Sequence, residues 1–259
     1  MKDYNDTFHK IIKEKDLTKY VEILLDYWSI NPTTVGHGFV HVTKVAVEAY
    51  ELGIENNYPN PEHLFIGGLF HDIYRPAEGK AGNEDQTDGA KITEELFNKN
   101  LISSEITQKI VNFIVSHDNW IGTNDISQYN LILSIADKIT HNTLMAYGYD
   151  WASNKHAREN NIKLPYSSHL DSLYDFIKYQ VRAWSLFKKH PIKGTDRAID
   201  SYLKIVEDTT KNYYLDKNGD HYLEFLENEV EKYRVEEKAL IGRFIQSQDK
   251  INSIMRGYY

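Results

Sequence analysis

Apolar residues recur at intervals of three and four positions along most of this chain, and that spacing decides which folds are open to it. In residues 16–30, Val21, Leu24 and Trp28 fall on one face of a helix, and Thr18 is the expected N-cap. The alternation that is typical of half-buried strands never runs beyond a few residues. We therefore expect an all-α protein.

The same spacing predicts further helices at 41–52, 61–72, 87–100, 103–117 and 129–144. Residues 61–72 begin with a proline, which suits the first position of a helix, and they are apolar nearly all round. We expect this segment to be a central, buried helix.

The character of the sequence changes after about residue 150. Amphipathic, tyrosine-rich and highly charged segments follow, as expected of long helices, at 168–190, 197–214 and 219–256. We expect an N-terminal helical segment, a core and a C-terminal helical extension that together form one compact unit, at residues 1–32, 33–150 and 151–259. The extension either packs on the core or joins two chains in a homodimer, and the sequence leaves both open.

Charge and cysteine content exclude several classes of protein. The formal net charge of −8 argues against an extended nucleic-acid surface, although a small phosphorylated ligand needs only a few local cations. The chain has no cysteine, which excludes disulfides, thiolate metal sites and a cysteine nucleophile. Its N-terminus lacks the apolar core of a signal peptide, and no apolar run approaches the length of a membrane span. We expect a soluble, cytoplasmic protein with no membrane partner.

A histidine and an aspartate, His71 and Asp72, stand side by side at the end of the apolar segment HLFIGGLF. Burying such side chains is costly unless they are paired. A divalent cation just off the helix can satisfy both, because neutral imidazole and carboxylate are ordinary metal ligands. Two further ligands should come from other helices. The candidates are His41, near the start of the preceding helix, and Asp137, which follows a mostly apolar run.

Taken one at a time, these side chains are more often a hydrogen-bonded histidine or an ion-paired aspartate. Together they resemble the HD-domain superfamily of metal-dependent phosphohydrolases over residues 33–145. The family pattern is a first histidine on a helix, a His-Asp pair about thirty residues later, and a distal aspartate often followed by lysine. His41, the pair at 71–72, and Asp137 followed by Lys138 are similar to that pattern.

Two stretches of the sequence account for the rest of the resemblance. GHGFVHVTKV is similar to the HGxxHxxxV opening of many members, and GGLFHDIYR is similar to AALLHDIGK, with Tyr74 in place of glycine and Arg75 in place of lysine. The resemblance implies an HD-domain helical bundle, here with additional C-terminal helices. It also implies that the metal ligands are His41, His71, Asp72 and Asp137.

Some family members bind a second metal through two more histidines between the pair and the distal aspartate. In this chain Asp85 stands where the first would be, and His117 matches the second, at the end of FIVSH. The resemblance therefore favours one metal, with Asp85 and His117 as candidates for a second metal or a contact to metal-bound water. The missing histidine also speaks against the two-iron oxygenase branch of this fold.

The resemblance implies hydrolysis of a phosphoester or phosphoanhydride, and metal chemistry agrees with it. A divalent cation lowers the pKa of bound water toward neutrality, which makes hydroxide for the attack, and it polarises a phosphoryl oxygen. Four protein ligands around a six-coordinate cation leave two positions for water and substrate. Mixed nitrogen and oxygen ligands do not choose among metals. The candidates are Mn²⁺, Fe²⁺, Co²⁺, Ni²⁺, Zn²⁺ and Mg²⁺.

The charge of a phosphate calls for nearby cations. Arg75 follows the pair by three residues, where its guanidinium can hold phosphate in a fork. Lys44 lies about one helical turn after His41 and shares its face. His117 is a candidate for holding a phosphate oxygen or moving a proton, with a plain histidine at a helix C-terminus as the alternative.

Three weaker candidates lie near the motif. Lys80 and Lys138 are better explained as solvated surface charges than as phosphate ligands. His37 either caps the pocket or simply begins its helix.

Three functions from different classes remain open. The first is a metal-dependent phosphohydrolase acting on a small phosphorylated molecule, with a nucleotide favoured because aromatic rings near the motif can stack on a base, namely Tyr74, Trp120, Tyr147 and Trp151. The second is a cyclic-nucleotide or dinucleotide phosphodiesterase with two metals. The third is a catalytically idle sensor module, which the intact set of four ligands argues against. The substrate itself cannot be named, because specificity resides in loops and added helices.

Overall fold

The computed structural model describes residues 3–33, 36–74, 83–117, 128–140, 192–214 and 220–258. Across these residues it contains α-helices, one short 3-10 helix and no strand, which confirms the all-α prediction. The first helices are α1 (Tyr4–Lys15), α2 (Thr18–Ile30), α3 (Phe39–Glu55), α4 (Pro61–Phe70), α5 (Asn83–Lys99), α6 (Ser104–Ser116) and α7 (Gln128–Thr140). The C-terminal ones are α10 (Thr195–Tyr214), α11 (Asp220–Ile241), α12 (Gln248–Ile254) and η1 (Met255–Tyr258).

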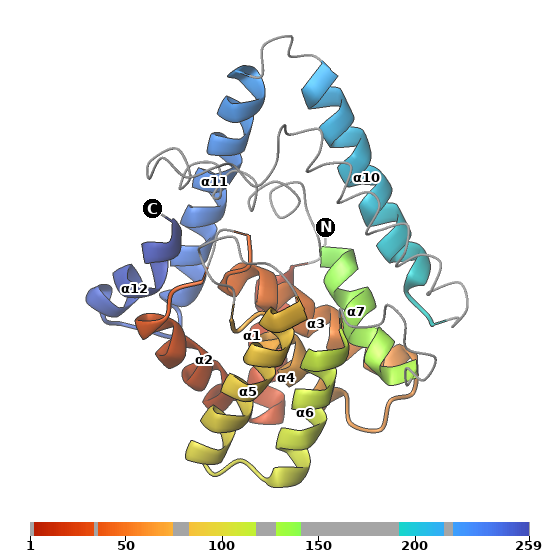
Figure 1. The fold of residues 1–259 in the computed structure, drawn as a ribbon, viewed down its shortest axis with the longest axis vertical. Helices are drawn as coiled ribbons and strands as arrows, with labels where there is room; N and C mark the ends of the chain where they lie inside the picture. The colour runs from red at the N-terminus through yellow and green to blue at the C-terminus, as the bar shows by residue number, and fades with distance from the viewer. Residues whose placement is uncertain are drawn as a thin grey trace.

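Helices α3 and α4 form the centre of the core (Figure 1). α3 makes its most extensive contacts with α4 and then with α7, while α1 and α2 pack against α3 and α4, respectively. α5 and α6 pack against each other, and α6 also contacts α4. Every residue of α4 from Leu64 to Phe70 is buried, which confirms the prediction of a central apolar helix.

The described C-terminal helices pack on this core. α10 contacts α7, α11 contacts α3, and α12 contacts α2. In Figure 1, α10 and α11 rise from opposite sides of the core and converge at their upper ends. The Ser201 hydroxyl on α10 donates to the Ile139 carbonyl (3.0 Å), and the Arg197 guanidinium reaches Glu48 and Glu55 on α3. The boundaries at 32/33 and 150/151, and the homodimer contact, stay predictions.

The first residues of two helices show which sequence signals for a helix N-terminus were reliable in this chain. Pro61 is the first residue of α4, as its fixed φ predicted. The prediction that Thr18 is an N-cap is wrong, because Thr18 is itself the first residue of α2 and Leu17 precedes it without a capping side chain. Leu17 is itself buried, at 5% exposure.

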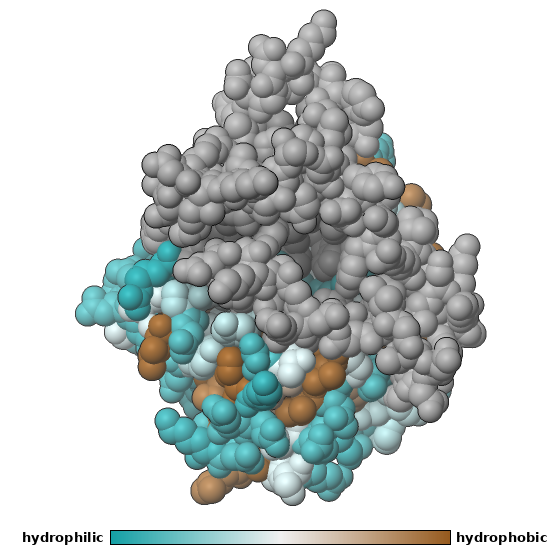
Figure 2. Space-filling view, viewed as in Figure 1, coloured by the Kyte–Doolittle hydropathy of each residue, from teal (hydrophilic) through white to brown (hydrophobic). Residues whose placement is uncertain are grey.

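None of the helices in the described residues is long and apolar enough to cross a membrane. The described part of the face in Figure 2 is mostly hydrophilic, with small, separate hydrophobic patches. The exposed large apolar side chains of the described residues are Ile30, Ile54, Leu101, Tyr129, Leu203 and Val235. Single exposed residues of this kind are ordinary on protein surfaces.

Gly68 allows α4 to lie directly against the backbone of α3. A β-carbon at this position would stand 2.6 Å from the Cα of Ala46 and 2.8 Å from its backbone nitrogen. Backbone atoms cannot move aside as the end of a flexible side chain can. Any larger residue would therefore push the two helices apart, and the residues that follow α4 would move with it.

We predict that Gly68→Ala lowers the free energy of unfolding by at least about 2 kcal/mol, because the new methyl group overpacks the α3–α4 contact. The measurement is urea denaturation followed by circular dichroism. Gly89→Ala on α5 is the matched control, since its β-carbon would make only ordinary contacts of 3.5 Å or more. That change should leave stability equal or slightly higher, by up to about 1 kcal/mol. Equal effects of the two substitutions would contradict the close approach.

Candidate metal centre

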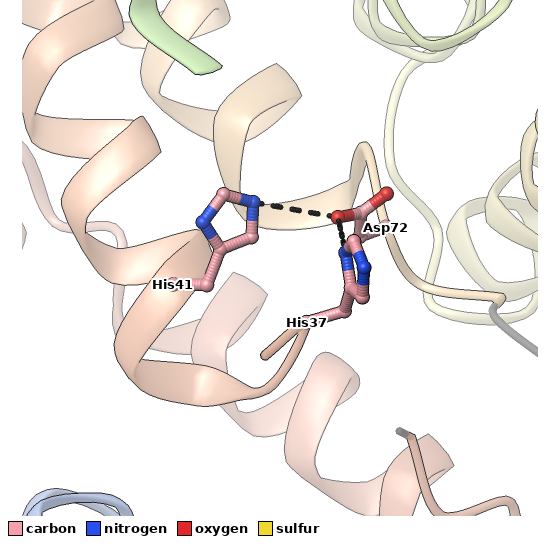
Figure 3. A group of neighbouring side chains, drawn as sticks. All are labelled: His37, His41 and Asp72. Carbon is pink, nitrogen blue, oxygen red and sulfur yellow. Dashed lines mark hydrogen bonds and ion pairs between the residues drawn. The ribbon is translucent and has the colours of Figure 1, made fainter. Parts of the chain in front are cut away.

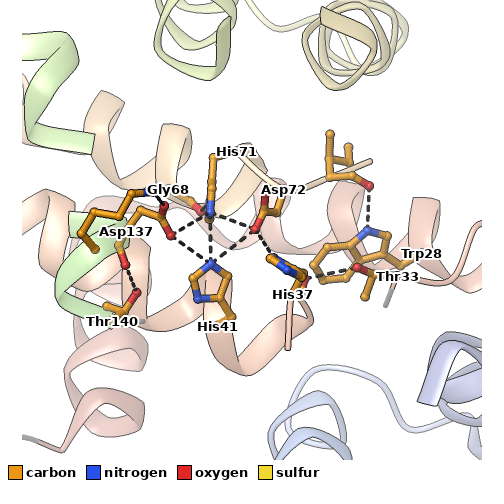
Figure 4. Close-up of polar contacts among 11 residues, drawn as sticks. Trp28, Thr33, His37, His41, Gly68, His71, Asp72, Asp137 and Thr140 are labelled. Carbon is orange, nitrogen blue, oxygen red and sulfur yellow. Dashed lines mark hydrogen bonds and ion pairs between the residues drawn. The ribbon is translucent and has the colours of Figure 1, made fainter. Parts of the chain in front are cut away.

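Three elements bring the motif residues together. His41 lies in the first turn of α3, and Asp137 lies in α7. The sequence placed His71 and Asp72 within a helix, but α4 ends at Phe70, so His71 is its C-cap and Asp72 lies in the following turn. The amide of Ile73 closes this turn by donating to the Phe70 carbonyl (3.1 Å). Because the chain turns here, both side chains of the pair reach the same point (Figure 4).

The Nε2 atoms of the two histidines lie close to each other and to one oxygen of each aspartate. The Nε2 atoms of His41 and His71 are 3.1 Å apart. His41 Nε2 is 3.4 Å from Asp72 Oδ2 and 3.3 Å from Asp137 Oδ1. His71 Nε2 is 3.2 Å and 3.7 Å from the same two oxygens. All four side chains are at most 5% exposed.

These separations match those of ligands around one small cation. Metal–ligand bonds of about 2.1 Å place neighbouring ligands about 3.0 Å apart in an octahedron and about 3.4 Å apart in a tetrahedron. The observed separations, 3.1 to 3.7 Å, include the tetrahedral value and begin just above the octahedral one. The donor set of two imidazole nitrogens and two carboxylate oxygens suits Zn²⁺ and the first-row divalent metals.

The charges of the cluster also call for a cation. Burial alone lowers the pKa of His71, but the carboxylates of Asp72 and Asp137 outweigh burial and raise this pKa to about 10. Two buried carboxylates therefore hold positive charge in their vicinity. A divalent ion between the four side chains supplies that charge and replaces the proton, as metal binding to histidine does in general.

A backbone hydrogen bond orients the ring of His71. Its Nδ1 lies 2.8 Å from the Gly68 carbonyl, which can only accept, so Nδ1 carries the hydrogen. In the neutral ring Nε2 then has its lone pair free to face the cluster. Histidine ligands are commonly fixed in this way through their second nitrogen.

Asp137 divides its two oxygens between the cluster and a lysine. Oδ1 faces the histidines, while Oδ2 accepts a hydrogen bond from Lys138 Nζ (2.6 Å). Lys138 is only 4% exposed, so the prediction that it is a solvated surface charge is wrong. The apolar spacing of the sequence could not predict that Lys138 is buried, because its burial depends on how α7 packs against its neighbours. The hydrogen bond from the ammonium group fixes the direction of the carboxylate.

His37 stands at the edge of the cluster. Its Nδ1 lies 2.8 Å from Asp72 Oδ2, the same oxygen that faces His41 (Figure 3). Its side chain is 16% exposed, more than any of the four central residues. His37 precedes Gly38, the N-cap of α3, and contacts the cluster through Asp72, while its role in capping a pocket stays a prediction.

His117 closes the cluster from the end of α6. Its Nδ1 lies 2.6 Å from the Ile114 carbonyl, and its ring centroid is 5.1 Å from that of His71. A nitrogen of His117, together with one donor atom each of His71 and Asp72, forms a group whose atoms lie within 4.8 Å of one another. His117 is fully buried. The geometry therefore supports a role for His117 at the site. It is also compatible with the alternative that His117 simply occupies the C-terminus of a helix.

The structure places Lys44 in the contact between α3 and α11. Its Nζ lies 3.5 Å from Glu236 on α11 and 5.8 Å from the ring centre of Tyr233. This gives Lys44 a carboxylate partner in the α3–α11 contact, and its role in phosphate binding stays a prediction. Arg75, Lys80, Trp120, Tyr147, Trp151 and the side chain of Asp85 lie outside the described residues.

Sequence reasoning missed Trp28, which supports the turn that carries His71 and Asp72. The indole of Trp28 on α2 is fully buried, and its Nε1 donates to the Ile73 carbonyl (3.0 Å), one residue beyond Asp72. The apolar pattern of α2 indicated that Trp28 is buried. It could not indicate the partner of the indole N–H, which lies 45 positions away in the sequence.

Residues 38–142 match the family model of the HD domain. This match agrees with the resemblance to the HD-domain superfamily of metal-dependent phosphohydrolases that the motifs predicted. Members of the family are generally metal-dependent hydrolases. No curated protein and no solved structure matches the chain.

We predict that Trp28→Phe lowers the free energy of unfolding by about 1–3 kcal/mol, because it leaves the buried Ile73 carbonyl without its donor. It should also weaken Mn²⁺ binding, measured by isothermal titration calorimetry, because the turn that carries Asp72 loses its support. Ile251→Val on α12, a buried change of about 1 kcal/mol on a helix without cluster residues, is the control. If both variants bind Mn²⁺ like the wild type, Trp28 is only a core residue.

Proposed function

We propose that the chain is a metal-dependent phosphohydrolase that cleaves a phosphoester or phosphoanhydride of a small phosphorylated substrate, with a nucleotide as the favoured class. The observation that carries this proposal is the convergence of His41, His71, Asp72 and Asp137 within the HD domain. Each histidine nitrogen lies 3.1 to 3.7 Å from the other and from one oxygen of each aspartate, and the buried carboxylates add negative charge, which fits one divalent cation.

When bound, a divalent cation supplies an activated water and polarises the phosphoryl oxygen that faces it. The protein's own residues do the rest. His41 and His71 give neutral nitrogens, and Asp72 and Asp137 give the charge that holds the ion. Lys138 keeps Asp137 aimed at the site through Oδ2, and the Gly68 carbonyl keeps His71 in the ligating tautomer.

His37 is the described side chain best placed to meet a substrate. It is part-exposed, it contacts Asp72, and it lies just before the helix that carries His41. We propose that its imidazole faces the substrate side of the cluster and hydrogen-bonds a phosphoryl oxygen. The guanidinium of Arg75, if it follows the family position, adds a fork of donors to the same group.

We predict that the purified chain binds about one Mn²⁺ per molecule and that Asp137→Asn abolishes most of this binding. The loss should exceed the roughly 10- to 100-fold that follows removal of a residue which only supports a ligand. Asp88→Asn makes the same chemical change on the exposed surface of α5 and should bind like the wild type. Titration calorimetry measures both affinity and stoichiometry. Unchanged binding by the Asp137 variant would exclude this site.

We further predict that the wild-type chain with Mn²⁺ or Co²⁺ releases inorganic phosphate from at least one member of a panel of nucleotides and sugar phosphates. His71→Gln, which removes one donor nitrogen, should lose this activity. A chain that binds Mn²⁺ and nucleotides but neither releases phosphate from any of them nor cleaves a cyclic dinucleotide would instead be a sensor.

A phosphodiesterase with two metals is the second candidate, and the position of His117 favours it. His117 joins His71 and Asp72 in a potential ligand group beside the first one. Two Mn²⁺ per chain, falling to one in His117→Ala, would support this candidate together with cleavage of a cyclic dinucleotide. A stoichiometry of one in both proteins supports the mononuclear enzyme.

A further inference from the structure

The buried side of α11 contains a carboxylate. Val230, Tyr233, Glu237 and Leu240 follow one another at intervals of three and four residues, and the three apolar members are buried. Glu237 is likewise fully buried, at 0% exposure. An ionised side chain in such a position requires strong hydrogen-bond partners.

Glu237 accepts hydrogen bonds from the first amides of α3. Its Oε1 accepts from the Phe39 N–H, and its Oε2 accepts from the Val40 N–H at 2.8 Å. The two segments lie almost two hundred positions apart in the sequence. The N-cap position of α3 is Gly38, which has no side chain to make these bonds.

A helix begins with backbone N–H groups that have no partner within the helix, and its dipole favours negative charge there. Glu237 therefore does for α3 what an N-cap side chain normally does, but from another helix. The residue that follows Val40 is His41, whose Nε2 faces the cluster. The carboxylate thus holds the turn of backbone that carries a candidate ligand.

We propose that Glu237 is a positioning residue of the candidate metal centre. By capping α3, the C-terminal helix α11 sets the position of His41 relative to His71, Asp72 and Asp137. This inference rests on the proposed function, because it assigns to part of the C-terminal extension a role in the geometry of that same site.

The test compares Glu237→Gln with Glu236→Gln. A glutamine at 237 keeps the shape but has one acceptor oxygen, and its NH₂ group faces an N–H, so one of the two bonds is lost. Glu236 is the matched control, because it is the adjacent residue on α11, is 41% exposed, and pairs with Lys44 instead. Glu237→Asp, which keeps the charge on a shorter side chain, is the second variant in case the glutamine protein does not fold.

The first measurement is amide hydrogen exchange in the metal-free proteins, read at Phe39, Val40 and His41. Glu237→Gln should exchange at least about 10-fold faster at these amides than the wild type, whereas Glu236→Gln should not. This readout needs no metal and no activity, so it tests the cap separately from the proposed function.

The second measurement is Mn²⁺ affinity by titration calorimetry, with the fold of each protein checked by circular dichroism. The dissociation constant of Glu237→Gln should rise about 10-fold or more, and that of Glu236→Gln should stay within about twofold. Glu237→Asp should lie between wild type and Glu237→Gln in both measurements.

The two measurements distinguish failure of the positioning role of Glu237 from failure of the proposed function. Faster exchange at the three amides with unchanged Mn²⁺ affinity overturns the positioning role, and so does unchanged exchange in either Glu237 variant. A wild-type chain that binds no Mn²⁺ overturns the proposed function, whatever the exchange rates show. Loss of both protection and affinity, confined to the Glu237 variants, supports the inference.

Discussion

Two buried carboxylates within reach of two buried imidazoles form an arrangement that requires positive charge at its centre. Asp72 and Asp137 each approach both histidine nitrogens, and none of the four side chains has much access to water. Without a compensating cation such a cluster would favour an open, hydrated state over a packed one. The surrounding helices hold these four groups together.

The supports of the cluster come from widely separated parts of the chain. Gly68 lets α4 approach the backbone of α3, Trp28 holds the carbonyl after the His-Asp pair, and Glu237 holds the first turn of α3. α2 precedes the matched HD domain, and α11 follows it. Regions outside the family motif therefore contribute directly to the backbone that carries two of its positions.

The sequence predicted the helices and the four central residues because both leave local signals. Apolar spacing marked α2, α3, α4, α6 and α7 near their observed positions, and the His-Asp pair was conspicuous at the end of an apolar segment. Local signals failed where a long-range contact decides. Burial of Lys138 depends on the packing of α7, and the role of Glu237 depends on a helix start far away in the sequence. For Glu237 one signal existed, since a carboxylate occupies the apolar face of an otherwise amphipathic helix.

The most direct test of the central claim is pulsed EPR of Mn²⁺ bound to the chain labelled with ¹⁵N-histidine. If the ion lies between His41, His71, Asp72 and Asp137, the spectrum contains hyperfine coupling to two imidazole nitrogens, and His41→Gln reduces this to one. A spectrum without histidine coupling, or one that His41→Gln leaves unchanged, would show that the cation binds elsewhere.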